Sequence, residues 1–91
     1  MPDKSFYTII TGASEGLGKS FALECASRGK NLLLVALPGK ELHDLATFLR
    51  KNYPIEVIAI EKDLSDTQQC KMLFREVKEA HYKVNMLINN V

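Results

Sequence analysis

Apolar residues recur along the chain in two alternating patterns. Four short runs are rich in β-branched, aliphatic and aromatic residues, which is typical of buried strands. The run NLLLVAL is apolar at every position after its first residue, as expected for a central strand of a parallel sheet with both faces covered. The four predicted strands cover residues 6–11, 31–37, 55–60 and 84–90.

The segments between these runs repeat their apolar residues with a helical period. A first helix is predicted from Gly16 to a C-terminal cap near Gly29, where glycine commonly ends a helix. Leu17, Phe21 and Cys25 are four residues apart and therefore share one face of this helix.

The second and third helices each carry an apolar stripe. The stretch Asn52-Tyr53-Pro54 is expected to end the second, because asparagine and proline both favour leaving a helix. The third opens with Ser65-x-x-Gln68, the spacing of a capping box. The predicted inner faces consist of Leu42, Leu45, Ala46 and Leu49 in the second helix, and of Cys70, Leu73, Phe74 and Val77 in the third.

Strands that alternate with amphipathic helices predict an α/β fold with a parallel sheet and right-handed crossovers. The order β-α-β-α-β-α-β corresponds to most of one half of a doubly wound, Rossmann-like sheet. We expect the strand order 3-2-1-4, with two helices on one face and one helix on the other. The 91 residues are enough for one small domain and no more, and this order would make residues 1–91 the N-terminal portion of a Rossmann-type domain.

Composition narrows the class of protein without identifying a function. Apolar residues make up 46% and charged residues 25% of 91 residues, as in ordinary globular proteins. The net charge of +1 gives no electrostatic case for binding nucleic acid or a membrane surface. The start of the chain does not resemble a signal peptide, and the two cysteines, Cys25 and Cys70, lack the spacing of a disulfide framework. We therefore expect reduced thiols in a cytoplasmic protein.

The stretch TGASEGLGKS, residues 11–20, has two interpretations as a phosphate-binding turn. In both, a glycine-rich turn follows a buried strand and opens a helix, whose free N–H groups attract phosphate. Gly18-Lys19-Ser20 ends as a P-loop does, but Ala13 stands where that motif needs its first glycine. A P-loop also needs an acidic residue at another strand end to hold magnesium, and only Glu61 could serve.

The alternative spacing resembles a known family. Residues 11–18 match the T-G-x-x-x-G-x-G loop of the short-chain dehydrogenase/reductase family. Asp63-Leu64 follows the third strand, where that family has an aspartate that binds the adenine ring. Asn89-Asn90-Val91 is similar to the family's N-N-A-G, with Val91 in place of alanine. The three motifs occur in the family's order and span the chain.

The resemblance implies roles for particular residues. Gly12, Gly16 and Gly18 would form the tight turn and let the pyrophosphate of a dinucleotide approach the backbone. Asp63 would contact the adenine, although an acid so close to Ser65 could instead cap the third helix. The remaining cofactor-binding residues implied by the family are Ser14, Leu17, Leu37, Leu64 and Asn90, whereas Asn89 could serve only to pair backbone groups.

The cofactor would be NAD or NADP, with a preference for NAD. Neither Ala36 nor Leu37, at the end of the second strand, supplies the acid typical of NAD sites or the arginine common in NADP sites. Glu15 would repel a 2′-phosphate, and Lys40 could partly compensate.

No catalytic residue of the family is identified in this chain. The family uses a serine and a Tyr-x-x-x-Lys pair, but the residues four positions after the tyrosines are Thr11, Val57 and Met86. We therefore expect the N-terminal, cofactor-binding part of an oxidoreductase that transfers hydride to or from a carbonyl or secondary alcohol, inactive by itself. The full-length protein would be a homo-oligomer. The alternative is a truncated, non-catalytic homologue that acts as a nucleotide-binding or interaction module.

Overall fold

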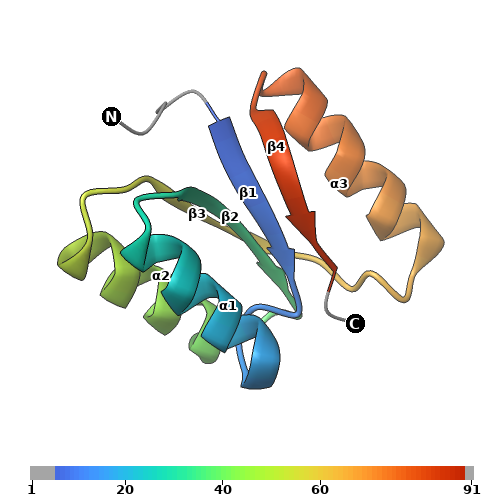
Figure 1. The fold of residues 1–91 in the computed structure, drawn as a ribbon. Coiled ribbons are helices and arrows are strands. Elements are labelled where there is room, and N and C mark those ends of the chain that lie inside the picture. Colours follow the sequence, from blue (N-terminus) through green and yellow to red (C-terminus); the bar gives the residue numbers. More distant parts are fainter. Residues whose placement is uncertain (1–5, 90–91) are drawn as a thin grey trace.

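The computed structural model describes residues 6–89 of the chain, and it confirms the predicted alternation of strands and helices (Figure 1). The first strand has the expected bounds, and the ends of the other strands differ from the expected ones by at most two residues. The elements are β1 (Phe6–Thr11), α1 (Gly16–Ser27), β2 (Asn31–Ala36), α2 (Lys40–Asn52), β3 (Val57–Glu61), α3 (Thr67–Glu79) and β4 (Lys83–Ile88).

The four strands form one parallel sheet in the order β3-β2-β1-β4, as predicted. Helices α1 and α2 lie on one face of the sheet and α3 lies on the other (Figure 1). The connections from β1 and from β3 therefore cross opposite faces. Between β1 and β4 the chain order reverses, which is where doubly wound sheets bind their ligands.

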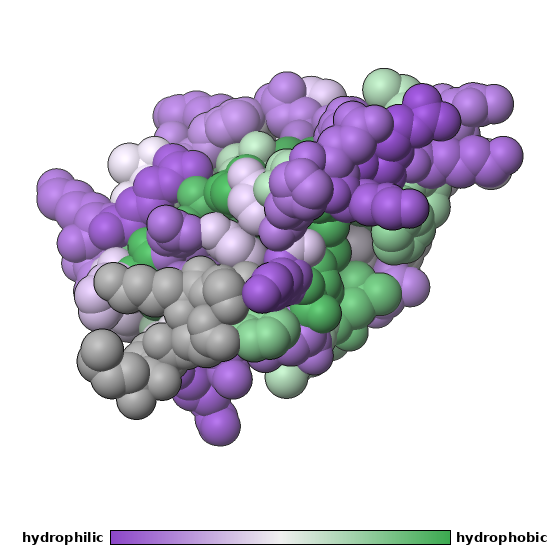
Figure 2. Space-filling model, turned by 90° about the horizontal axis from the view of Figure 1, so that it is seen from above, coloured by the Kyte–Doolittle hydropathy of each residue, from purple (hydrophilic) through white to green (hydrophobic). Residues whose placement is uncertain are grey.

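Strand β4 lies at one border of this sheet and is largely exposed. Figure 2 looks onto the molecule from the side on which β1 and β4 begin, and it shows hydrophilic residues around a band of apolar ones. Met86 is 45% exposed and Leu87 is 53% exposed. A parallel strand is normally covered on both faces, so β4 is the least protected strand of the sheet.

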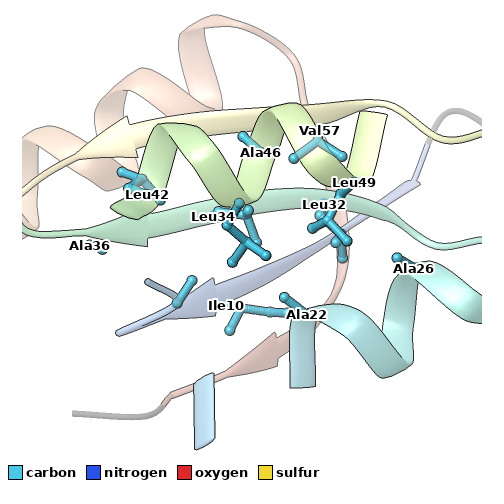
Figure 3. Packing of buried hydrophobic residues seen from close by; sticks show 12 residues of the cluster. Ile10, Ala22, Ala26, Leu32, Leu34, Ala36, Leu42, Ala46, Leu49 and Val57 are labelled. Carbon is cyan, nitrogen blue, oxygen red and sulfur yellow. The ribbon is translucent and has the colours of Figure 1, made fainter. Parts of the chain in front are cut away.

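Two apolar clusters hold the layers together, one on each face of the sheet. Alternate residues of β2 point to opposite faces. Leu32 and Leu34 therefore pack under α1 and α2 (Figure 3), and Leu33 packs under α3. All three leucines are fully buried. The expected stripe of α2 is confirmed as core: Leu42, Leu45, Ala46 and Leu49 are all buried.

The buried face of α1 is not the one marked by its large apolar residues. Gly18, Ala22 and Ala26 face the sheet, whereas Leu17 is 60% exposed and Phe21 is 36% exposed. Small side chains allow the helix backbone to approach the sheet closely, so the apolar period in the sequence indicated the wrong face. Ala22 and Ala26 lie against Ile10 and Leu32 of the sheet in Figure 3.

The start of α3 also departs from the sequence prediction. Asp66, rather than Ser65, is the N-cap, and its carboxylate accepts a hydrogen bond of 2.9 Å from the N–H of Gln68. The predicted capping box is therefore wrong. Of the predicted inner face, Leu73 and Val77 are buried, but Phe74 is 59% exposed.

Candidate functional site

The carboxyl ends of the strands enclose a hollow of about 450 Å³. It lies where the β1–α1 turn, the end of β2 and the segment after β3 meet, at one edge of the sheet. Four of the residues expected to bind cofactor line it together: Gly12, Leu37, Asp63 and Leu64. The other lining residues are Val35, Ala36, Lys62 and Ser65.

The turn between β1 and α1 adopts a backbone that favours glycine. Gly12 has a φ of 61° and Gly16, the first residue of α1, has a φ of 57°. Both values lie in the left-handed region, which costs other residues about 1–2 kcal/mol. Between them Ala13 is fully buried, and its N–H donates a hydrogen bond of 3.2 Å to the carbonyl of Val35. The turn is thereby fixed against β2.

The amino end of α1 has the features of an anion-binding helix terminus. Glu15 is the N-cap residue, and no side chain within the described part of the chain caps it. Beside Gly16, apart from its chain neighbours and the helix's own backbone, residues 6–89 place no atom within 4 Å of where a Cβ would stand. The first turn of a helix carries unpaired N–H groups and a partial positive charge, so this open space suits a phosphate group.

Three further expected residues lie around this turn but outside the hollow. Ser14 lines a separate hollow of about 470 Å³ between α1 and α2, where Lys19 and Asp44 also lie. Leu17 is largely exposed, and Gly18 is buried on the inner face of α1.

Asp63 is held by a local turn at the rim of the hollow. Its Oδ1 accepts hydrogen bonds from the hydroxyl of Ser65 at 2.6 Å and from the N–H of Ser65 at 3.0 Å. These two bonds favour the ionised form and lower the pKa of Asp63. The N–H of Asp63 donates to Oε1 of Gln69 at 2.7 Å. Because Asp66 caps α3, the alternative role of Asp63 as the helix cap is wrong.

Lys62 is a residue of this hollow that the sequence analysis did not identify. Its side chain is 13% exposed, and its Nζ lies 3.0 Å from Oε1 of Glu76 on α3. The sequence signal was its position directly before Asp63. Lys40, by contrast, was expected to compensate Glu15. It extends into solvent and lies 3.9 Å from Asp44, so its charge is already partly balanced.

Polar residues also meet at the reversal point between β1 and β4. The hydroxyl of Thr11 donates a hydrogen bond of 2.9 Å to Oδ1 of Asn89. The contact joins two side chains, whereas the structural role considered for Asn89 from the sequence was the pairing of backbone groups. Asn90, the remaining expected cofactor ligand, lies outside the described residues.

Cys25 and His43 lie away from the hollow. Burial raises the pKa of the Cys25 thiol, which disfavours the reactive thiolate. His43 lies 2.8 Å from Oε2 of Glu61 on the surface. Within residues 6–89, no three side chains of the metal-binding types gather in a cluster. Over the same range, no helix has the length and apolarity needed to cross a bilayer.

The chain was compared with known protein families and with related proteins. The family model for short chain dehydrogenase matches residues 7–91. The chain is 37% identical over 89 residues to a very-long-chain 3-oxoacyl-CoA reductase of Kluyveromyces lactis, which covers 97% of the chain and 25% of that protein. It is 32% identical over 85 residues to the human inactive hydroxysteroid dehydrogenase-like protein 1, covering 93% of the chain and 26% of that protein.

A solved structure extends the similarity to three dimensions. The short-chain dehydrogenase from Sphingobium yanoikuyae in complex with NADPH superposes with a TM-score of 0.84 at 34% identity. The match covers 93% of this chain and 33% of that one. The chain therefore spans about a quarter to a third of the length of these relatives.

Proposed function

Since the chain belongs to the short-chain dehydrogenase family, we propose that residues 1–91 are the N-terminal portion of the NAD(P)-binding domain of an oxidoreductase. The whole enzyme would transfer hydride to or from a carbonyl or a secondary alcohol. The nicotinamide ring supplies the hydride acceptor or donor when the dinucleotide is bound. The contribution of this chain is to bind and orient the dinucleotide.

One observation carries the proposal: the turn at the start of α1 leaves room for a phosphate beside Gly16. The first turn of a helix carries unpaired N–H groups, and Gly12 and Gly16 both have the left-handed φ that suits glycine at this turn. The hollow lined by Leu37 and Asp63 begins at the same turn, since Gly12 lines it. A pyrophosphate on the helix and an adenosine in the hollow would form one continuous ligand.

The residues that would hold this ligand follow from their positions. Gly12, Gly16 and Gly18 shape the backbone around the pyrophosphate. Asp63 is already oriented and ionised, so it can accept a hydrogen bond from the adenine amino group. Leu64 and the exposed Leu37 supply apolar contact area at the rim. Ser14, Leu17 and Asn90 complete the proposed set from the β1–α1 turn and the segment after β4.

We propose NAD rather than NADP as the preferred cofactor. Leu37 brings no cation to the end of β2, and the Lys40 ammonium is engaged with Asp44. Glu15 is exposed at the mouth of the turn and would disfavour a 2′-phosphate. Lys62 lines the hollow and is the cation that could favour NADP, but Glu76 pairs with it.

Titration of the chain with NADH and NADPH, followed by nicotinamide fluorescence or calorimetry, tests the proposal. We expect saturable binding of both, tighter for NADH. Gly16→Asn is the informative variant, because asparagine tolerates a left-handed φ and adds a side chain to the phosphate space. It should weaken binding about tenfold, which corresponds to roughly 1.4 kcal/mol. Tight binding of ATP with Mg²⁺ and none of NADH would instead favour the P-loop interpretation.

A second candidate function is a non-catalytic binding module. It is favoured by the absence of a Tyr-x-x-x-Lys pair in the 91 residues and by the similarity to a human relative whose name describes it as inactive. The two functions differ in turnover. We expect no NADH oxidation by residues 1–91 with any carbonyl compound. A 3-oxoacyl thioester is the first substrate to try with the product of the full gene, given the fungal relative.

A further inference from the structure

Helix α3 holds the segment that lines the proposed adenosine site just after β3. Its residues Gln69 and Glu76 are seven positions apart, so they lie on one side of the helix about two turns from each other. Oε1 of Glu76 lies 3.0 Å from Nζ of Lys62, and Oε1 of Gln69 accepts a hydrogen bond of 2.7 Å from the N–H of Asp63. Leu64, which follows, packs against the apolar cluster on the α3 side of the sheet. Three consecutive residues of the wall of the hollow are thus fixed on the α3 side.

The backbone of Asp63 leaves the sheet at a border, and Gln69 supplies its hydrogen-bond acceptor there. Strand β3 is the border strand in the described order β3-β2-β1-β4. The N–H of Lys62 still donates a hydrogen bond of 2.9 Å to the carbonyl of Ala36 in β2, whereas the N–H of Asp63 donates to a side chain of α3. A buried backbone N–H without an acceptor is costly, so this partly buried bond fixes the path of the chain after β3.

The position of the Asp63 carboxylate depends on that path. The turn that orients the carboxylate is local, because both of its hydrogen bonds come from Ser65. Such a turn moves together with the backbone that carries it. Since Asp63 lines the hollow, a displaced backbone would move its carboxylate away from a bound adenine.

From these contacts we propose that Gln69 is a positioning residue for the dinucleotide. By accepting from the N–H of Asp63, it sets the distance between the Asp63 carboxylate and the adenine amino group. Gln69 acts through Asp63 and not by contact with the cofactor. The helix itself does not require an amide here, because methionine and glutamine have similar helix propensities. The inference rests on the proposed function, in which the adenine lies against Asp63.

Two dinucleotides that differ only at the purine test this role. NADH carries the exocyclic amino group, whereas the reduced nicotinamide hypoxanthine dinucleotide has an oxygen in its place and cannot donate to Asp63 from that position. Calorimetry measures the affinity of the full chain for each. Gln69→Met keeps the length of the side chain but removes the acceptor, so it should weaken the binding of NADH about fivefold. It should leave the affinity for the hypoxanthine dinucleotide nearly unchanged.

Variants of the same helix turn provide the controls. Gln68→Met makes the same substitution at the adjacent, exposed position of α3, and should bind both dinucleotides as the wild type does. Gln69→Glu keeps the acceptor oxygen and should keep most of the affinity for NADH. If Gln69→Met does not fold, Gln69→Ala removes the same acceptor and gives the same comparison.

The outcomes separate this inference from the proposed function. Equal losses for both dinucleotides in Gln69→Met would show that Gln69 only supports the fold, and an unchanged affinity for NADH would show that it has no role in binding; either result would overturn the inference alone. A wild-type chain that binds neither dinucleotide would overturn the proposed function and this inference with it. Equal affinity of the wild type for both would refute the adenine contact of Asp63, and therefore the role of Gln69.

Discussion

The hydroxyl of Thr11 donates a hydrogen bond to the side-chain oxygen of Asn89 across 2.9 Å, although 78 positions separate the two residues in the chain. Thr11 ends β1, and Asn89 follows β4. The bond therefore ties together the two strands between which the chain order of the sheet reverses. It also holds the carboxyl end of the exposed strand β4 in place.

Replacing Thr11 by valine tests the strength of this tie. The variant keeps the side-chain shape but removes the donor, so the free energy of unfolding should fall by about 1 kcal/mol. Urea denaturation followed by circular dichroism measures the change. Thr47→Val, the same substitution at an exposed position on α2, is the control and should have a smaller effect. Equal losses in both variants would show that the Thr11–Asn89 bond contributes little.

Substitutions of Gly16 should lower the free energy of unfolding in an unusual order. Because its φ is 57° and no described side chain crowds it, the cost of a substitution is one of backbone conformation rather than of space. Gly16→Ala should lower the free energy of unfolding by about 1 kcal/mol, and Gly16→Asn should lower it by less. Thermal or urea unfolding of both proteins checks the order. A more stable alanine variant would mean that the turn does not need the left-handed backbone.

Tyr7 should ionise at a higher pH than an ordinary tyrosine. Its hydroxyl donates a hydrogen bond to the Glu56 carboxylate, and this bond, with burial, raises the pKa of Tyr7 to about 12 from the ordinary value of 10.0. The protonated form is favoured in the folded state, so this stabilisation is complete below pH 10 and is lost as the pH rises toward 12.

Absorbance at 295 nm during an alkaline titration measures the ionisation of Tyr7. The ionisation near pH 12 should disappear in Tyr7→Phe. It should move to lower pH in Glu56→Gln, because the hydrogen bond to the carboxylate and the repulsion of the phenolate by its charge are both lost. Tyr82 packs edge-on against Tyr7 with ring centroids 4.9 Å apart, so Tyr82→Phe is the control for changes in local packing. Unchanged titration curves in Tyr7→Phe would refute the assignment.

Asp63 should remain ionised in more acidic solution than an ordinary aspartate. The hydroxyl and N–H of Ser65 lower the pKa of Asp63. The folded state thus gains stability above the unfolded pKa, and loses it as the pH falls through the lower folded value. Carboxyl-carbon resonances followed through an acid titration measure the shift. Ser65→Ala should return part of it, while Ser20→Ala on α1 should leave it unchanged.

The sequence predicted those features that depend on residues close to one another in the chain. Alternating apolar runs predicted the seven elements, and the carboxyl ends of parallel strands meet by geometry, so Gly12, Leu37 and Asp63 could be placed together in advance. The turn glycines were equally predictable, because a left-handed φ calls for that residue. The helix-capping alternative for Asp63 failed because Asp66, which stands one residue nearer to α3 than Ser65, supplies the N-cap.

Other features depend on contacts between distant segments and could not be predicted in this way. Apolar spacing marked Leu17 and Phe21 on α1, but the inner face is set by how closely the helix lies against Ile10 and Leu32. Phe74 fits the stripe of α3 by spacing, yet it is 59% exposed although its neighbour Leu73 is buried. Lys62 gained its place in the hollow from Glu76, fourteen residues away.

The row of small residues Gly18, Ala22 and Ala26 lets α1 pack on the sheet with little side-chain volume between them. A larger side chain in place of Ala26 would tilt α1 and displace its amino end at Gly16 without contacting the turn itself. Affinity for an anion at that tip would then respond to a substitution nearly three helical turns away. Selection for tight recognition would accordingly act on residues that no bound molecule ever meets.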